Sequence, residues 1–319
     1  MSRQRLNFSL VLGGFFFGIL LTYTMVPSFV NHESQHAAKH QTNHGFSKRA
    51  VGQDILKFGN PGPVNDLLER TEYTISYNRR DRIAYWAGEH LTAANLVKGS
   101  GVDRDNSDFK EDTSLPSIFR SHLADYKGSG YDRGHQAPAG DAGATQAQMD
   151  ETFLLSNMAP QVGVGFNREY WAYFEAFCRD LTQNFTDVYV FTGPLLLPQT
   201  SDGASVLGDT SIKLDGTKVT KAAAPSAQTS YSMNYKVIGS GGANVAVPTH
   251  FFKVLLTVKG GKYTSGAFVL PNQAIKKSTA LSEFQVDLSS LQKASGLQFF
   301  TDLSSTNLAD LCATVKCVV

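Results

Sequence analysis

The stretch Asp132–Pro138 places an arginine and a histidine two residues apart, at Arg133 and His135, and asparagines follow at Asn157 and Asn167. An imidazole with a near-neutral pKa can take a proton from water. An arginine can hold a phosphate group, and an amide oxygen can bind a hard cation. Together these residue types indicate metal-dependent hydrolysis of phosphodiester bonds.

A predicted helix over residues 167–184 positions part of this set. Apolar residues recur in it at three- and four-residue spacing, and Asn167 is a suitable N-cap. Asn167, Trp171, Glu175 and Arg179 step by four, so they form one stripe along the helix. Glu175 could hold a metal-bound water, and Arg179 could reach a phosphate. The alternative for this pair is a solvated ion pair within the helix.

Runs of apolar and β-branched residues, bounded by turn residues, predict five strands. The first two are joined by the charged turn 78–81. Because no repeated strand–helix units occur, we expect an α+β fold with a mainly antiparallel sheet and flanking helices. The predicted strands are 73–77, 83–89, 188–192, 249–258 and 265–270.

Composition sets few limits on function. The chain has 319 residues, 42% of them hydrophobic, with a net charge of +1, so a polyanionic ligand needs a local basic patch. The sequence lacks the motifs of zinc proteases, phosphate-binding glycine loops and serine esterases. Cys178 fits a buried thiol, and whether Cys312 and Cys317 are bridged stays open. Three other histidines lack metal-ligand spacing and are interpreted as structural: His90, His122 and His250.

Residues 1–30 are predicted to be a membrane anchor or targeting segment. Arg3 and Arg5 precede a stretch from Leu6 to Val30 that carries no charge and is about long enough to span a bilayer. A cleaved secretory signal begins in the same way and is the alternative, although no clear cleavage site follows.

The remaining chain divides into a linker and one domain. Residues 31–53 are polar and lack apolar periodicity, which is typical of a flexible tether. Residues 54–319 are expected to form a single domain. Within it, residues 199–230 are rich in Ser, Thr, Ala, Gly and Asp. This composition favours a low-complexity surface insertion, ordered or disordered, over a second domain.

Several motifs in one order closely resemble the DNA/RNA non-specific nucleases, whose active site is a ββα-metal motif, and in particular the mitochondrial endonuclease G branch. The resemblance covers roughly residues 55 to 318, apart from the 199–230 insertion. Besides Asp132–Pro138, it is carried by Phe58–Pro63, Tyr77–Arg79, Phe109–Asp112, Phe153–Met158, Gly165–Arg168, Thr192–Leu195 and Val247–Lys253.

The resemblance implies a role for each candidate residue. His135 matches the general base and Asn167 the single direct protein ligand of Mg, with Mn possible in its place; Glu175 would act through a metal-bound water. Arg104 and Arg133 match arginines that hold the phosphate, and Arg179 could assist them.

Two further residues are expected to support the site. Asn157 matches an asparagine beside the catalytic residues, which we expect to hold geometry. From its place in the turn, Asp132 is expected to fix the turn or orient its neighbours.

The implied activity is an endonuclease that cuts DNA and RNA with little sequence preference and leaves 5′-phosphates. The resemblance also implies a homodimer, anchored in the mitochondrial inner membrane and facing the intermembrane space. Two alternatives stay open at this point. The chain could be a catalytically silent nucleic-acid-binding protein on the same scaffold, or a secreted scavenging nuclease.

Overall fold

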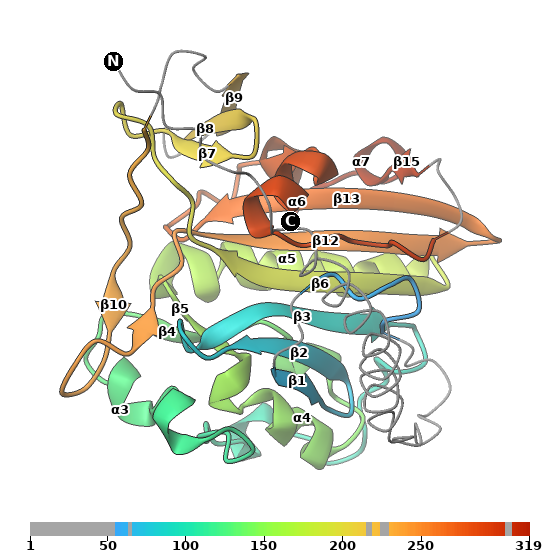
Figure 1. Cartoon of the computed structure of the whole chain (residues 1–319). Coiled ribbons are helices and arrows are strands. Elements are labelled where there is room, and N and C mark those ends of the chain that lie inside the picture. Colours follow the sequence, from blue (N-terminus) through green and yellow to red (C-terminus); the bar gives the residue numbers. More distant parts are fainter. Residues whose placement is uncertain (1–54, 63–65, 215–218, 224–229, 304–307) are drawn as a thin grey trace, which may run out of the picture. The chain divides into compact units, whose positions relative to one another are not determined.

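An antiparallel sheet organises the part of the chain that the structure describes, which is residues 55–62, 66–214, 219–223, 230–303 and 308–319 of a computed structural model (Figure 1). The hydrogen-bonded order is β1-β2-β3-β6-β12-β13-β14, and β15 pairs with β13 in parallel. This confirms the predicted α+β class with a mainly antiparallel sheet. The strands are β1 (Asp66–Glu69), β2 (Tyr73–Asn78), β3 (Ile83–Leu91), β6 (Asp187–Leu195), β12 (His250–Lys259), β13 (Lys262–Pro271), β14 (Gln285–Val286) and β15 (Ala309–Asp310).

Local turn residues set two hairpins of this sheet. Between β2 and β3, the Asn78 side-chain oxygen accepts hydrogen bonds from the backbone N–H groups of Arg80 (3.0 Å) and Asp81 (3.2 Å). Between β12 and β13, Gly260 and Gly261 have φ angles of +57° and +74°, which glycine adopts without strain. Because these signals are local, all five predicted strands are present, with some shift at their ends.

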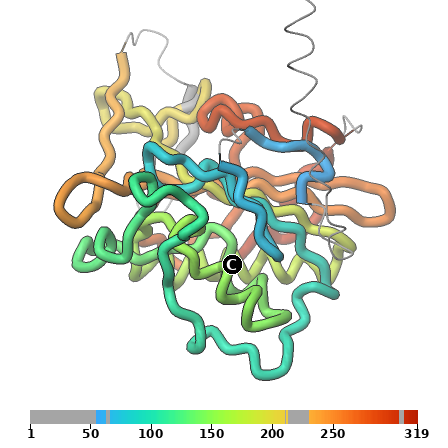
Figure 2. The backbone as a smooth tube through the Cα atoms, turned by 60° about the horizontal axis from the view of Figure 1, so that its bottom comes forward, coloured from blue at the N-terminus to red at the C-terminus, as the bar shows by residue number. Residues whose placement is uncertain are grey.

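The connection from β3 to β4, residues 92–131, is a long loop (teal to green in Figure 2) with only three short helical turns. Backbone hydrogen bonds fix its middle: Lys110 N–H donates to Phe153 O (3.1 Å), and Leu155 N–H donates to Lys110 O (2.8 Å). They bring Phe109 next to Phe153. The turns are η1 (Arg104–Asn106), η2 (Ser117–Phe119) and α3 (Leu123–Tyr126).

A two-stranded sheet and the helix that follows it have the layout expected of a ββα motif. Strand β4 (Asp132–His135) pairs antiparallel with β5 (Met158–Gln161), so His135 lies opposite Met158. After β5 the chain passes through a turn into α5 (Tyr170–Asp180). The short elements around these are η3 (Ala139–Asp141), α4 (Gln146–Thr152), η4 (Leu155–Asn157), η5 (Gly163–Asn167) and η6 (Leu181–Gln183).

The predicted start of the long helix at Asn167 is wrong. Helix α5 begins at Tyr170, with Glu169 as its N-cap, and Asn167 ends the preceding turn η5. The cause is Gly165, whose φ is +83° and whose added Cβ would lie 2.5 Å from the Cβ of Ala274. This close approach to a segment far along the chain forces a tight turn, which no local helical pattern reveals.

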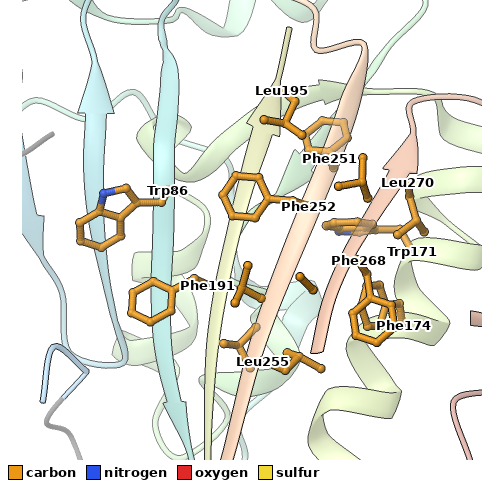
Figure 3. Packing of buried hydrophobic residues seen from close by; sticks show 14 of the residues in the cluster. Trp86, Trp171, Phe174, Phe191, Leu195, Phe251, Phe252, Leu255, Phe268 and Leu270 are labelled. Carbon is orange, nitrogen blue, oxygen red and sulfur yellow. The ribbon is translucent and has the colours of Figure 1, made fainter. Parts of the chain in front are cut away.

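The central strands of the large sheet bury side chains on both faces, and Figure 3 shows part of this packing. Successive side chains of a strand point to opposite faces. Phe251 therefore packs against Trp171 of α5, with ring centroids 5.6 Å apart, whereas Phe252 packs against Phe299 on the other face, at 5.9 Å. Each fully buried side chain of this size contributes roughly 1.5–3 kcal/mol. This packing holds α5 firmly on the sheet.

The region predicted to be a low-complexity insertion contains regular structure in its described part. Strands β7 (Ser205–Leu207), β8 (Thr210–Leu214) and β9 (Val219–Ala223) form a small antiparallel sheet. It lies against helix α6 (Leu288–Ser295): Asp209 pairs with Lys293 of α6. The described part is therefore an ordered surface element.

The other short elements are β10 (Val237–Ile238), β11 (Val245–Ala246), η7 (Leu281–Phe284) and α7 (Leu311–Thr314). Cys312 and Cys317 form a disulfide, and Cys178 is a buried free thiol. Across the described residues, no helix has the length and apolarity needed to cross a bilayer. The predicted anchor (1–30) and tether (31–53) lie outside those residues.

Candidate active site

A cleft of about 700 Å³ opens beside β4 and the turn that precedes α5. Three predicted site residues line it: Arg104 from η1, Arg133 from β4 and Asn167 from η5. Asp132, Arg168 and Phe109 also contribute to its walls. The fold thus brings together residues that lie in three separate segments of the sequence.

His135 lies at the end of β4, next to this cleft, and is almost enclosed. Only 6% of it is exposed, and its ring packs against Phe153 (centroids 4.9 Å apart) and Phe109 (5.7 Å). Its Nε2 atom is buried and has no hydrogen-bond partner within the described residues. Burial, together with the nearby positive charge of Arg104, lowers the pKa of His135 to about 3. The near-neutral pKa expected from the sequence is therefore wrong, and the imidazole is neutral at physiological pH.

The same two phenylalanine rings make cation–π contacts with the two arginines. The guanidinium of Arg133 lies 4.1 Å from the ring centroid of Phe109, and that of Arg104 lies 5.2 Å from the ring centroid of Phe153. Such cation–π contacts orient a guanidinium without using its hydrogen-bond donors. Both arginines therefore keep donors for an anion in the cleft, close to His135.

Asp132 orients Asn167. The Asn167 Nδ2 group donates a 2.9 Å hydrogen bond to Asp132, and Arg168 donates two more, of 2.7 and 2.6 Å. The hydrogen bonds from Arg168 and then Asn167 hold the pKa of Asp132 below its usual value despite partial burial. With its amide N–H engaged, Asn167 keeps its side-chain oxygen for the cleft. The sequence indicated an orienting role for Asp132 but not its partners.

Asn157 is completely buried and contacts backbone groups only. Its Oδ1 accepts from Ala137 N–H (2.9 Å), and its Nδ2 donates to the carbonyl oxygens of Ala137 and Thr152 (both 2.8 Å). These bonds fix the chain just after His135. Asn157, included among the predicted catalytic residues, is a positioning residue in this geometry, because its amide is fully buried and bonded to the backbone.

Glu175 and Arg179 lie on α5 and do not line the cleft. Arg179 donates a 2.7 Å hydrogen bond to Asp141, so its partner is a residue of η3 and not Glu175. Burial raises the pKa of Glu175 to about 7, against the opposing charge of Lys253.

A buried charged cluster beneath α5 was not found from the sequence. It consists of Glu89 on β3, Asp141 on η3 and Lys253 on β12, and each is at most 5% exposed. The Lys253 ammonium donates a 2.7 Å hydrogen bond to Thr192 and lies 4.8 Å from the Trp171 ring centroid. Burial raises the pKa of both Glu89 and Asp141. A single charge within an otherwise apolar strand is the signal that could have revealed it.

The histidines interpreted as structural have partners outside the cleft. His90 Nε2 lies 2.9 Å from Asp187 Oδ1, and His122 Nδ1 lies 3.0 Å from Glu111 Oε2. His250 is buried, and burial lowers its pKa to about 4.

Known proteins share both the sequence and this fold. A family model for the DNA/RNA non-specific endonucleases matches residues 51–306. A nuclease of Syncephalastrum racemosum is 53% identical over 314 residues, which cover 97% of this chain and 91% of that protein. A mitochondrial nuclease of Saccharomyces cerevisiae is 40% identical over 283 residues, covering 87% of this chain and 78% of the relative.

A solved structure agrees with these matches. The endonuclease G chain in a complex with its inhibitor EndoGI superposes with a TM-score of 0.69 at 41% sequence identity, covering 80% of this chain and 94% of that one. These proteins are thus similar to this chain over most of its length, in sequence and in fold. The chain belongs to the DNA/RNA non-specific endonuclease family.

Proposed function

We propose that this endonuclease cleaves DNA and RNA in the cleft beside β4, with His135 as general base and a divalent cation at Asn167. The observation that carries the proposal is that two phenylalanine rings contact both the histidine and the two arginines. Phe109 and Phe153 contact His135 and also carry Arg133 and Arg104. One packed unit therefore holds a proton acceptor and two phosphate-binding groups.

The burial of His135 indicates which ring nitrogen acts as the base. Because Nε2 is enclosed, Nδ1 is the ring nitrogen left to accept a proton from a water molecule in the cleft. The neutral ring can accept that proton, although its low pKa makes it a weak base. A bound phosphodiester brings negative charge beside Arg104 and His135, which raises the basicity of the imidazole. Attack of the water on phosphorus, with the 3′ oxygen leaving, gives a 5′-phosphate.

The two arginines stabilise the charge that develops on the phosphate. A guanidinium stays protonated and can donate two parallel N–H bonds to phosphate oxygens. Donors placed in advance, where charge increases in the transition state, can contribute several kcal/mol to catalysis. Arg133 and Arg104 line the cleft and suit this role, whereas the ion pair between Arg179 and Asp141 makes Arg179 a support for α5.

The residues present fit a magnesium ion. Asn167 lines the cleft, and its side-chain oxygen accepts no hydrogen bond from the described residues. Among those residues no group of three or more His, Cys, Asp or Glu side chains could hold a metal. An ion at Asn167 would therefore keep most of its waters, as magnesium readily does, and manganese could replace it. When bound, the cation would neutralise charge on the scissile phosphate and the departing oxygen. Glu175 would act on it only through water.

The proposal extends to the location and assembly of the protein. We infer that the protein is mitochondrial, supported by the Saccharomyces cerevisiae relative, which is a mitochondrial nuclease. Anchoring of residues 1–30 in the inner membrane, exposure to the intermembrane space and a homodimer are further parts of the proposal. Protease protection in isolated mitochondria and light scattering of the purified protein test them, and N-terminal sequencing distinguishes an anchored from a secreted form.

Plasmid cleavage tests the chemistry. In Mg²⁺, the wild type should nick and linearise the plasmid, and a strong chelator should abolish this. His135→Ala should lower cleavage at least a hundredfold yet still retard DNA in a gel with the metal chelated. His122→Ala, a histidine paired with Glu111 outside the cleft, is the matched control and should cleave normally. Unchanged cleavage by His135→Ala would refute the assigned base.

A further inference from the structure

Part of the cleft lining has no role in the proposed chemistry. Besides Arg104, Arg133 and Asn167, the lining includes an apolar and aromatic set, Leu123, Tyr126 and Tyr131. A volume of about 700 Å³ is within the usual range of small-ligand sites, roughly 300–1,000 Å³. The cleft therefore has room for more than a phosphate group.

The sequence itself places Tyr131 near the phosphate-binding residue Arg133. It precedes Arg133 by two residues where the chain enters β4. Side chains two residues apart in extended chain lie on the same face, roughly 7 Å from each other. A nucleotide whose phosphate contacts Arg133 would thus place an adjoining group near the Tyr131 ring.

The Tyr131 ring is more accessible for stacking with a planar group than the other aromatic rings of the cleft. Tyr131 is half-buried, whereas Tyr126 is only 5% exposed and forms the interior of the wall. Phe109 already carries Arg133 at 4.1 Å and packs against Phe153, with centroids 4.9 Å apart. The Lys236 ammonium lies over the Tyr131 ring only at the longer distance of 5.9 Å, so Tyr131 is the least occupied of these three rings.

Two lysines flank the aromatic wall. Lys127 lines the cleft, and the ammonium of Lys236 lies 5.9 Å from the Tyr131 ring centroid. Lysines as well as arginines thus lie near the Tyr131 part of the lining. In a nucleic-acid strand each nucleoside has a phosphate on either side, and the flanking phosphates could contact these cations.

We propose that Tyr131, supported by Leu123 and Tyr126, forms a nucleobase-stacking subsite beside the scissile phosphate. The inference rests on the proposed function of the cleft. Stacking accepts every base because each has a π face, so this subsite adds affinity without sequence preference. It requires an unstacked base, and therefore favours single-stranded over duplex substrates.

A substrate with one cleavable linkage tests the subsite. The probe is a thymidine tetranucleotide with a central phosphodiester and methylphosphonates elsewhere, made in three forms: complete, or abasic on the 5′ or the 3′ side of the phosphodiester. Wild-type kcat/KM should fall about tenfold for one of the two abasic forms, since stacking of a base is worth about 5- to 150-fold in binding. Tyr131→Ala should lose about as much on the complete probe and show no further loss on that abasic form.

Three variants complete the test. Tyr131→Phe keeps the ring and should behave as wild type, whereas Tyr131→Leu keeps apolar packing without the ring and should resemble Tyr131→Ala. Tyr231→Ala removes an exposed tyrosine that does not line the cleft and should change nothing. The preference for single-stranded over duplex DNA should decrease in Tyr131→Leu, which a purely structural defect would not produce.

The outcomes separate this inference from the proposed function. If Tyr131→Leu keeps the wild-type loss on the abasic form, or the wild type cleaves all three probes equally, the subsite is wrong while the nuclease chemistry stands. If the wild type fails to cut even plasmid DNA in Mg²⁺, the proposed function itself is wrong.

Discussion

Asp132 and Asn167, 35 residues apart in the sequence, are joined by a 2.9 Å hydrogen bond from the Asn167 amide nitrogen to the Asp132 carboxylate. The bond settles which end of the amide faces Asp132, because only the NH₂ group can donate to a carboxylate. The oxygen is thereby directed to the cleft, where a hard cation would need it. A residue of the β4 strand thus sets the orientation of the proposed metal ligand.

Asp132→Ala should therefore weaken metal use more than it weakens folding. Loss of a group that orients a metal ligand typically lowers affinity or activity about 10- to 100-fold. We expect the Mg²⁺ concentration for half-maximal plasmid cleavage to rise by a factor in this range. Arg168→Gln, which removes the other partner of Asp132 at a side chain 64% exposed, should have a much smaller effect. An unaltered Mg²⁺ requirement in Asp132→Ala would show that Asn167 is oriented by other contacts.

Asn157→Asp should destabilise the protein. The change places a carboxylate oxygen opposite the carbonyl oxygens of Ala137 and Thr152, where the amide nitrogen now donates. Each unsatisfied buried group costs about 1–3 kcal/mol, so the free energy of unfolding in urea should fall by at least about 2 kcal/mol. Cleavage should also decline, because these bonds fix the chain after His135. Asn184→Asp, at an exposed position, serves as control, and equal stability of both variants would contradict this reading of Asn157.

The sheet could be predicted because its signals are local. Each strand carries its own apolar run, and turns such as Gly260-Gly261 require no knowledge of the rest of the chain. The start of α5 could not be predicted in this way. It depends on the contact of Gly165 with Ala274, which exists only after the chain has folded.

The site, too, was predictable only where its signals are local in the sequence. Residue types and spacing identified Arg133 and Asn167, which line one cleft, and His135, which packs against Phe109 of its wall. The pKa of His135 could not be read from the sequence, because the rings that enclose it come from two other segments. Arg179 was assigned to phosphate for a similar reason: its partner Asp141 is distant in sequence, and only the fold shows that the pair is formed.

His250 predicts a pH dependence of stability. Burial lowers its pKa from 6.5 to about 4 in the folded protein. Between these values the unfolded chain binds a proton that the folded chain does not, so stability decreases as the pH falls from 6.5 towards 4. The contribution should amount to about 2 kcal/mol between pH 7 and pH 5. His250→Gln should show a correspondingly smaller loss of unfolding free energy over this range. A loss equal to that of the wild type would mean that His250 is protonated in the folded state.

Lys253→Met tests the buried charged cluster, because it removes the cation but keeps most of the side-chain volume. Glu89 and Asp141 are then left buried with less compensation, and breaking a buried ion cluster typically costs about 3–5 kcal/mol. Since burial already raises the pKa of both carboxyl groups, they can avoid the penalty by taking up protons. The defect in unfolding free energy should therefore be largest at pH 8 and smaller at pH 5.5.

The control is Lys259→Met, an exposed lysine at the end of the same strand, which should change stability by less than about 0.5 kcal/mol. Since Lys253 also contacts Trp171 of α5, its loss should loosen the helix that follows Asn167. Hydrogen exchange of the α5 amides should then be faster in Lys253→Met and unchanged in Lys259→Met. Wild-type stability at pH 8 would show instead that Glu89 and Asp141 are neutral in the folded protein, with no need of a buried cation.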